Sequence, residues 1–203
     1  KGVGIAIDYT KALENLGRAA LQGHAQAQVY YAILAMMCHL SHRVQIYTYN
    51  LHQAKKSGLS LAYVEEAKVL LGLYKRKNVL CNDVEEAKEL LKTAIAADDP
   101  YALYIQGRYL EDEDSLQLAS EKGCGKASYY IGKRLIEEGK LDDAYSIIEK
   151  GAEQGHPKAV FILGFLNKIK KNKAEAEEFM TKGVYMAGNS TIAVKYALER
   201  IQG

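Results

Sequence analysis

Residues 2–27 read GVGIAIDYTKALENLGRAALQGHAQA, and weaker copies of this stretch recur along the chain. Its fixed points are an Asp-x-x-Lys-Ala segment from Asp8 to Ala12, a run of small residues, and a Gly-His turn shortly before Ala27. Self-similarity over a few tens of residues is typical of stacked supersecondary units, because each unit buries its apolar face against its neighbours. The stretch therefore predicts an all-α chain built from repeated helix pairs.

One helix of each predicted pair carries an anchor alanine in the pattern Ala-x-x-x-(Leu/Ile)-Gly. Only two copies keep the whole pattern, and these end at Gly132 and Gly164. Most intervals between anchors are close to the roughly 34 residues of a helix–turn–helix repeat. Small residues at fixed offsets predict close helix packing, because the contacting side chains set the distance between axes. The anchors are Ala27, Ala62, Ala102, Ala127, Ala159 and Ala193.

The other helix of each pair begins with Asp-x-x-(Lys/Glu)-Ala, best preserved at Asp8 and Asp83, with a looser copy at Asp143. An Asp at this position can accept a hydrogen bond from an unpaired amide of the first helical turn. Turns are expected at Gly23-His24, Asp98-Asp99-Pro100 and Gly155-His156-Pro157, where Gly suits a left-handed cap and Pro suits the first helical turn. The acidic residues 111–114 predict an abrupt turn into a short helix.

Together these motifs resemble Sel-one-like repeats, a subclass of the tetratricopeptide-type α-solenoids, over essentially the whole chain. The resemblance is strong at residues 2–27 and 127–164 and degenerate at 28–80. It implies an all-α fold, a right-handed α-solenoid of antiparallel helix pairs with about five repeats, in a single repeat domain. The expected units are 1–26 (partial), 27–61, 62–101, 102–126, 127–158, 159–192 and 193–203 (partial or capping helix). We expect the chain to be a fragment of a longer protein.

Composition restricts the class of partner and the compartment. The chain has 203 residues, 48% of them hydrophobic, which is enough for a sizeable core. Its net charge of +2 generates no overall field that would favour nucleic acid. The longest apolar run, Val29 to Cys38, is about half of the roughly 20 residues that a membrane span requires. Three cysteines without a CxxC motif favour a reducing compartment, such as the cytoplasm or a host cytosol.

No local motif indicates catalysis, a cofactor or a metal. Gly2-Val3-Gly4 lacks a preceding strand and the further glycine of a nucleotide-binding loop. His24 and His156 occupy the same turn in different repeats, which predicts a structural role. His39 and His42 are close in sequence, but no Cys, Asp or Glu constellation accompanies them. We therefore expect a chain that is not an enzyme.

The resemblance also implies a concave groove lined by the anchor-bearing helices. Groove positions then lie one residue before each anchor and two, six and nine residues after it. The N-terminal units offer Val29, Ile33, Met36, Val64, Lys68 and Leu71 at these positions. The remaining units predict a partner-binding groove formed by Tyr101, Tyr104, Arg108, Lys126, Tyr129, Lys133, Lys158, Phe161, Phe165 and Lys168. Some of these tyrosines could instead belong to the core, because the chain has 15 Tyr and no Trp.

Aromatic faces with interleaved Lys and Arg suit an extended peptide that carries carboxylates. The leading hypothesis is therefore a protein-interaction scaffold with a protein or peptide partner, an acidic segment being favoured. Single-stranded nucleic acid also binds such surfaces, but the near-neutral charge does not favour it. A second hypothesis is a structural or regulatory arm of a larger protein, such as a secreted bacterial effector, an envelope assembly factor or an enzyme.

Overall fold

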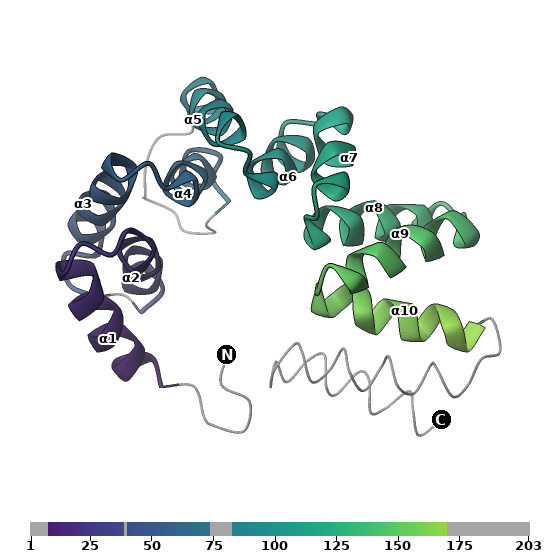
Figure 1. The fold of residues 1–203 in the computed structure, drawn as a ribbon, viewed down its shortest axis with the longest axis horizontal. Coiled ribbons are helices and arrows are strands. Elements are labelled where there is room, and N and C mark those ends of the chain that lie inside the picture. The colour runs from purple at the N-terminus through teal and green to yellow at the C-terminus, as the bar shows by residue number, and fades with distance from the viewer. Residues whose placement is uncertain (1–7, 39, 74–82, 170–203) are drawn as a thin grey trace. The chain divides into compact units, whose positions relative to one another are not determined.

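A computed structural model describes residues 8–38, 40–73 and 83–169, and all regular structure in these residues is helical (Figure 1). Two compact units divide the chain, and each is treated by itself. The N-terminal unit, Ile7–Glu111, contains α1 (Tyr9–Leu21), α2 (Ala25–Met37), α3 (Arg43–Lys56), α4 (Ser60–Leu70), α5 (Val84–Ala96) and α6 (Pro100–Tyr109). The C-terminal unit, from Asp112 onward, contains α7 (Glu113–Glu121), α8 (Gly125–Glu137), α9 (Leu141–Glu153) and α10 (Pro157–Ile169).

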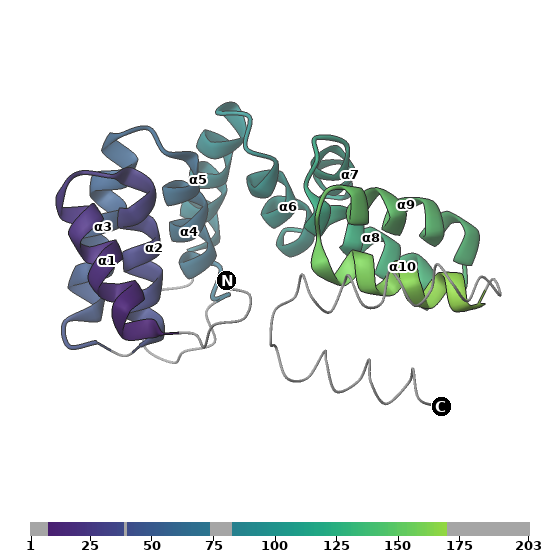
Figure 2. The same cartoon turned by 60° about the horizontal axis from the view of Figure 1, so that its bottom comes forward.

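Two kinds of helix alternate, as the sequence predicts. The anchor helices α2, α4, α6, α8 and α10 each carry the anchor alanine as their third residue, and α1, α3, α5, α7 and α9 are their companion helices. In the N-terminal unit α2 packs on α3 and α4 on α5, while α4 also contacts both α2 and α6. In the C-terminal unit α9 packs between α8 and α10, and these two anchor helices touch each other (Figures 1 and 2). Within each unit the anchor helices therefore adjoin one another.

Helix starts follow the predicted capping chemistry. The carboxylate of Asp8 accepts a hydrogen bond from the Lys11 amide at 3.0 Å, and that of Asp83 accepts one from Glu86 at 2.9 Å. Asp112 caps the nine-residue α7 in the same way, which confirms the expected turn into a short helix. Asp143 differs, because α9 begins after Lys140 and the Asp lies within its first turn.

Tight turns lie at the predicted junctions. Gly23 and Gly155 adopt positive φ angles of 85° and 78°, which glycine accommodates without steric cost. Asp98 also has a positive φ, of 61°, and Pro100 is the first residue of α6. Before the anchor helix α4 the residue in this position is Gly58, with φ 73°. The second repeat thus keeps this turn although its sequence is degenerate.

Helix packing in the C-terminal unit explains the recurrent small residues. The anchor alanines Ala127 and Ala159 are completely buried. A β-carbon on Gly132 would lie 2.5 Å from Cγ1 of Ile148, closer than atoms can approach. A β-carbon on Gly151 would lie 3.1 Å from those of both Ser128 and Ala159, on α8 and α10. The predicted close approach of neighbouring helices is therefore confirmed.

A buried polar network also joins α7, α8 and α9. The Ser128 hydroxyl donates to the side-chain oxygen of Gln154 at 2.8 Å, so the neighbouring hydroxyl of Ser120, also 2.8 Å away, must donate to Ser128. Gln154 in turn donates from its amide nitrogen to the Ser120 carbonyl at 2.9 Å. Each of these buried groups thereby has a partner, which is what a stable polar core requires.

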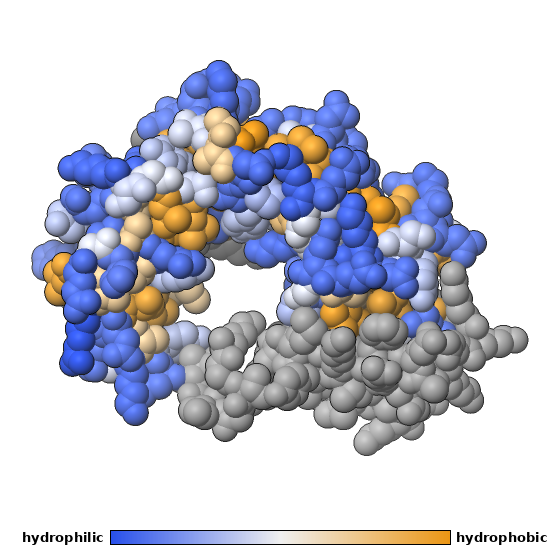
Figure 3. All heavy atoms as spheres, in the orientation of Figure 1, coloured by the Kyte–Doolittle hydropathy of each residue, from blue (hydrophilic) through white to orange (hydrophobic). Residues whose placement is uncertain are grey.

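The surface of the companion helices is polar. Figure 3 shows a largely hydrophilic surface over α5, at the top of the view. On this helix Lys88 and Lys92 form ion pairs with Glu85 and Glu89, three residues earlier. Such exposed pairs stabilise a helix only slightly, so the face is a solvated one. Within the described residues no helix combines the length and the apolar character needed to cross a membrane.

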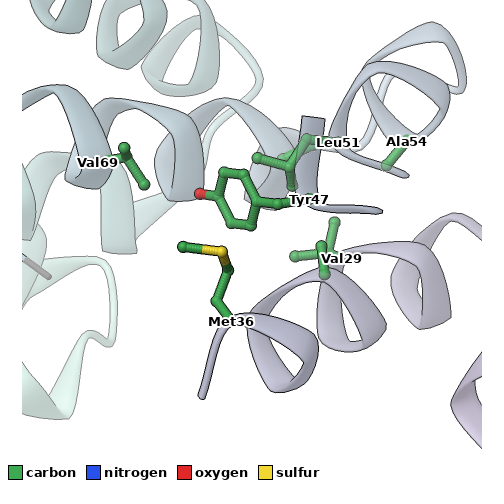
Figure 4. Close-up of a cluster of buried hydrophobic side chains, with 8 residues drawn as sticks. Val29, Met36, Tyr47, Leu51, Ala54 and Val69 are labelled. Carbon is green, nitrogen blue, oxygen red and sulfur yellow. The ribbon is translucent and has the colours of Figure 1, made fainter. Parts of the chain in front are cut away.

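The core of the N-terminal unit is centred on Tyr47 (Figure 4). Its ring packs among Val29, Met36 and Leu51, which are all buried. Its hydroxyl donates to the main-chain carbonyl of Glu65 at 3.0 Å, which ties α3 to α4. Burial raises the pKa of the Tyr47 hydroxyl well above its ordinary value, so the group remains a hydrogen-bond donor.

Candidate functional site

In the N-terminal unit a basic–aromatic cluster spans two adjacent anchor helices. The cluster consists of Lys68 on α4 and Tyr101, Tyr104 and Arg108 on α6. The Lys68 ammonium lies 5.7 Å from the ring centroid of Tyr101, and this ring stacks on Tyr104 with centroids 5.7 Å apart. Arg108 donates to the Tyr104 hydroxyl at 2.5 Å, which continues the line of contacts along α6. Two stacked tyrosine rings thus lie between two cations along this line of contacts.

A buried carboxylate holds one end of this cluster. Glu65, one turn before Lys68 on α4, has a side chain that is only 5% exposed. The Lys68 ammonium donates to both of its oxygens, at 2.7 and 2.9 Å. The charge of Lys68 is therefore balanced within the protein, and only 17% of its side chain is exposed.

The repeat register explains why these residues meet. Lys68 is at the sixth position after its anchor, and Tyr101 is at the position before the next anchor. Because α4 and α6 touch, these two positions of successive repeats become neighbours. Tyr104, at the second position after its anchor, is only 5% exposed, so of the two stacked rings it is Tyr101 that is partly exposed.

Other residues at positions expected to line the groove are buried in this unit. Val29 and Val64 are completely buried, and Met36 is 9% exposed. The expectation that these three residues line the groove is wrong. The helices α2 and α4 each pack against a companion helix and against another anchor helix, so more than one of their faces belongs to the core.

In the C-terminal unit a second cluster joins α8 and α10. The ring of Tyr129 lies 4.9 Å from that of His156, tilted by 33°. The Lys158 ammonium lies 6.0 Å from the centroid of Tyr129. Lys126, one turn before Tyr129, contributes a second positive charge near the histidine. The structure thus brings together three predicted groove residues and one histidine that the sequence indicated only as part of a turn.

Other predicted groove residues lie apart from these clusters. Lys133 is exposed and pairs with Glu137 on its own helix at 2.9 Å, which raises the pKa of Lys133. Phe161 and Phe165 are half-buried on α10. The side chain of Lys168 lies outside the described residues, as does His39.

Sequence reasoning overlooked Glu65 and His156 as parts of these surfaces. Glu65 could have been found from its spacing to Lys68, since residues three apart share one face of a helix. His156 required a comparison between repeats, because its ring meets Tyr129 on a different anchor helix. Within the described part of the chain, His, Cys, Asp and Glu side chains form no group of three or more that could hold a metal ion.

His156 is a neutral cap at physiological pH. Its Nδ1 accepts a hydrogen bond from the Ala159 amide at 3.3 Å, which requires an unprotonated nitrogen. Burial, followed by the charges of Lys126 and Lys158, lowers the pKa of His156 from 6.5 to about 4. Protonation of His156 would therefore break the hydrogen bond from the Ala159 amide and would place a third positive charge beside Lys126 and Lys158.

We expect this histidine to make the C-terminal unit less stable in mild acid. Between pH 6.5 and about 4 the unfolded chain binds a proton that the folded chain rejects. The contribution of neutral His156 to the free energy of unfolding is fully present above pH 6.5 and is lost as the pH falls toward 4. Urea unfolding across this pH window should show that His156→Asn loses less stability than the wild-type chain. The asparagine side chain can still accept the capping hydrogen bond but does not bind a proton in this range. Equal losses in the two proteins would contradict the assignment.

Comparison with solved structures places this architecture among Sel1-like repeat folds. One similar crystal structure is that of a Sel1 repeat protein from Oxalobacter formigenes, with 23% sequence identity and a TM-score of 0.61. The alignment covers 98% of this chain and 61% of the Oxalobacter formigenes chain. Another is the crystal structure of c5321, which displays an SLR fold and is a protective antigen of uropathogenic Escherichia coli strains. Its sequence identity is 19% and its TM-score 0.52, and the alignment covers 89% of this chain and 42% of the c5321 chain. Each similarity shows the fold alone.

The chain spans only part of both proteins, about three fifths of the first and two fifths of the second. No protein-family model matches the chain, and no curated protein sequence matches it. The described residues, all of whose regular structure is helical and forms about five helix pairs, nevertheless have the architecture of a Sel1-like repeat fold. Repeat folds of this kind commonly use their extended surfaces to bind other proteins.

Proposed function

We propose that the chain is a non-catalytic scaffold that binds a segment of a partner protein on the surface of its anchor helices. The observation that supports this most directly is the ordered line of Lys68, Tyr101, Tyr104 and Arg108 across two adjacent repeats. Tyr and Arg are the residues that most often dominate the energetics of protein interfaces, because they combine contact area with directed hydrogen bonds. Neighbouring side chains already restrain these residues, which reduces the entropy lost on binding.

The partner segment is proposed to be acidic. In the C-terminal unit Lys126 and Lys158 generate enough positive potential to help lower the pKa of His156. Carboxylates of a partner would reduce the repulsion among these groups, whereas a basic segment would increase it. In the N-terminal unit Arg108 lies within cation–π distance of Tyr104 and Tyr109, which places a further positive charge beside aromatic rings.

Charge reversal on the two clusters tests the proposal. Arg108→Glu and Lys158→Glu should each lower the apparent affinity for a captured partner at least about tenfold, because a like charge then faces the acidic segment. Lys158 is preferred to Lys133, whose charge is already paired with Glu137. The measurement is affinity capture by the immobilised chain, with quantitative mass spectrometry of the recovered proteins.

Lys92→Glu is the matched control, since it makes the same charge change on the hydrophilic surface of α5. It should leave capture unchanged. Circular dichroism melts of all three variants separate lost binding from lost folding. Recovery of the same proteins, in the same amounts, by wild type and both cluster variants would disprove the binding surface.

A further inference from the structure

A cavity unrelated to the charged clusters lies among α1, α2 and α3 in the N-terminal unit. It has a volume of about 570 Å³, within the range of ligand pockets in proteins. No residue with a formally charged side chain is among those that line it in the described structure. Its polar and aromatic lining residues are Gln28, Tyr31, Gln45, Tyr49, Asn50 and Gln53.

One wall of the cavity depends on a glycine in the middle of α1. A β-carbon on Gly17 would lie 3.3 Å from Cε2 of Tyr31, so the ring of Tyr31 lies directly against the backbone of α1. Glycine inside a helix is unfavourable relative to alanine. At this position the close contact with Tyr31 accounts for its presence and fixes the ring as part of the wall.

The carboxamides in the cavity are oriented through their nitrogens. Gln28 is 7% exposed and donates from its amide nitrogen to the Ala20 carbonyl at 3.3 Å. Its side-chain oxygen is buried and has no hydrogen-bond partner in the described structure. Asn50, also 7% exposed, donates from its amide nitrogen to the Ile46 carbonyl at 2.8 Å. Each side chain therefore keeps its oxygen as an acceptor and a second N–H as a donor, so the cavity favours ligands that both donate and accept hydrogen bonds.

The edge of the cavity is apolar. The side chain of Leu21, the last residue of α1, is part of the lining although the residue is 89% exposed, and Tyr49 is 63% exposed. Ile46 adds a further aliphatic surface. A saccharide would supply hydroxyl donors but no aliphatic side chain to cover Leu21. A polypeptide supplies both, through its amide N–H groups and an apolar side chain.

We propose that this cavity binds an uncharged, extended polypeptide segment of a partner protein with an aliphatic side chain at its centre. Main-chain N–H groups of the segment donate to the carboxamide oxygens, and its carbonyls accept from the remaining amide N–H groups of the lining. The aliphatic side chain packs between Tyr31, Ile46 and Leu21. A charged segment is disfavoured, because no opposite charge replaces its lost hydration. The site is separate from the basic–aromatic surface, so either can be present without the other.

The probe for this site is N-acetyl-leucine N-methylamide, an uncharged compound with two peptide bonds and one aliphatic side chain. Titrated into the isotope-labelled full chain, it should shift the nuclear magnetic resonance signals of Gly17 and of the Gln28 and Asn50 side-chain amides, saturating at roughly 1 mM. N-acetyl-leucine, which ends in a carboxylate, and N-acetylglucosamine should bind at least about tenfold more weakly.

Two variants and a matched control complete the experiment. Gln28→Met removes the unpartnered oxygen at nearly constant volume, and Gln45→Trp narrows the cavity from an exposed position; each should weaken binding about tenfold. Gln26→Met makes the same chemical change at an exposed position of α2 and should have no effect. The proposal is overturned if no saturable shift occurs at the cavity, if the saccharide binds there more tightly than the amide, or if Gln26→Met weakens binding as much as Gln28→Met.

Discussion

Gly132→Ala is expected to destabilise the chain by about 1–3 kcal/mol, even though alanine is the better helix former by about 1 kcal/mol. The new β-carbon would lie 2.5 Å from Cγ1 and 2.6 Å from Cδ1 of Ile148, a completely buried side chain. Either Ile148 leaves its rotamer or α8 and α9 move apart, and both changes cost packing energy. Urea unfolding followed by circular dichroism measures the total effect, and hydrogen exchange of α8 and α9 amides measures it locally.

A double-mutant cycle provides the sharper form of this prediction. Ile148→Ala alone should cost about 2–5 kcal/mol, because it leaves a cavity. In that background Gly132→Ala should become neutral or stabilising, since the clash is gone and the helix propensity of alanine remains. Ser146→Ala, at an exposed position of α9, should change stability by less than about 0.5 kcal/mol. Additive effects of the two core substitutions would show that the close contact is not what selects glycine.

Lys68→Met is expected to destabilise the N-terminal unit by about 1.5–3 kcal/mol, the range for a hydrogen bond to a charged group. The carboxylate of Glu65 is 5% exposed and takes two hydrogen bonds from Lys68, so it loses both in a setting where water cannot replace them fully. The contact between Lys68 and the ring of Tyr101 is lost as well. Urea unfolding at about pH 7 measures the effect.

Removing both charges should cost less than removing one. Glu65→Gln combined with Lys68→Met is expected to recover most of the lost stability, because no buried charge remains unbalanced. Lys88→Met, in an exposed pair with Glu85, is the control and should change stability by less than about 0.5 kcal/mol. A double variant as unstable as Lys68→Met would show that the ion pair is not the source of the effect.

The helical elements could be predicted from sequence because their signals are local. Asp83 caps α5 through an amide three residues away, and Gly155 terminates α9 through its own backbone. Neither interaction depends on distant parts of the chain. The candidate surface was only partly predictable, because a register carried over from a repeat family places a residue on a helix but does not give its burial. Tyr104 and Lys133 both occupy predicted groove positions, but Tyr104 is largely buried and Lys133 forms an ion pair with Glu137.

The sequence by itself determined the alternation of two helix types, their caps and the positions that must remain small. These properties follow from hydrogen bonding and steric limits within a few residues. Only the tertiary structure decided which surface residues act together: Lys68 with Tyr101, Tyr129 with His156, and the carboxamides around the cavity between α1 and α3. Each of these groups joins separate helices, and the distance between two helices depends on every side chain packed between them.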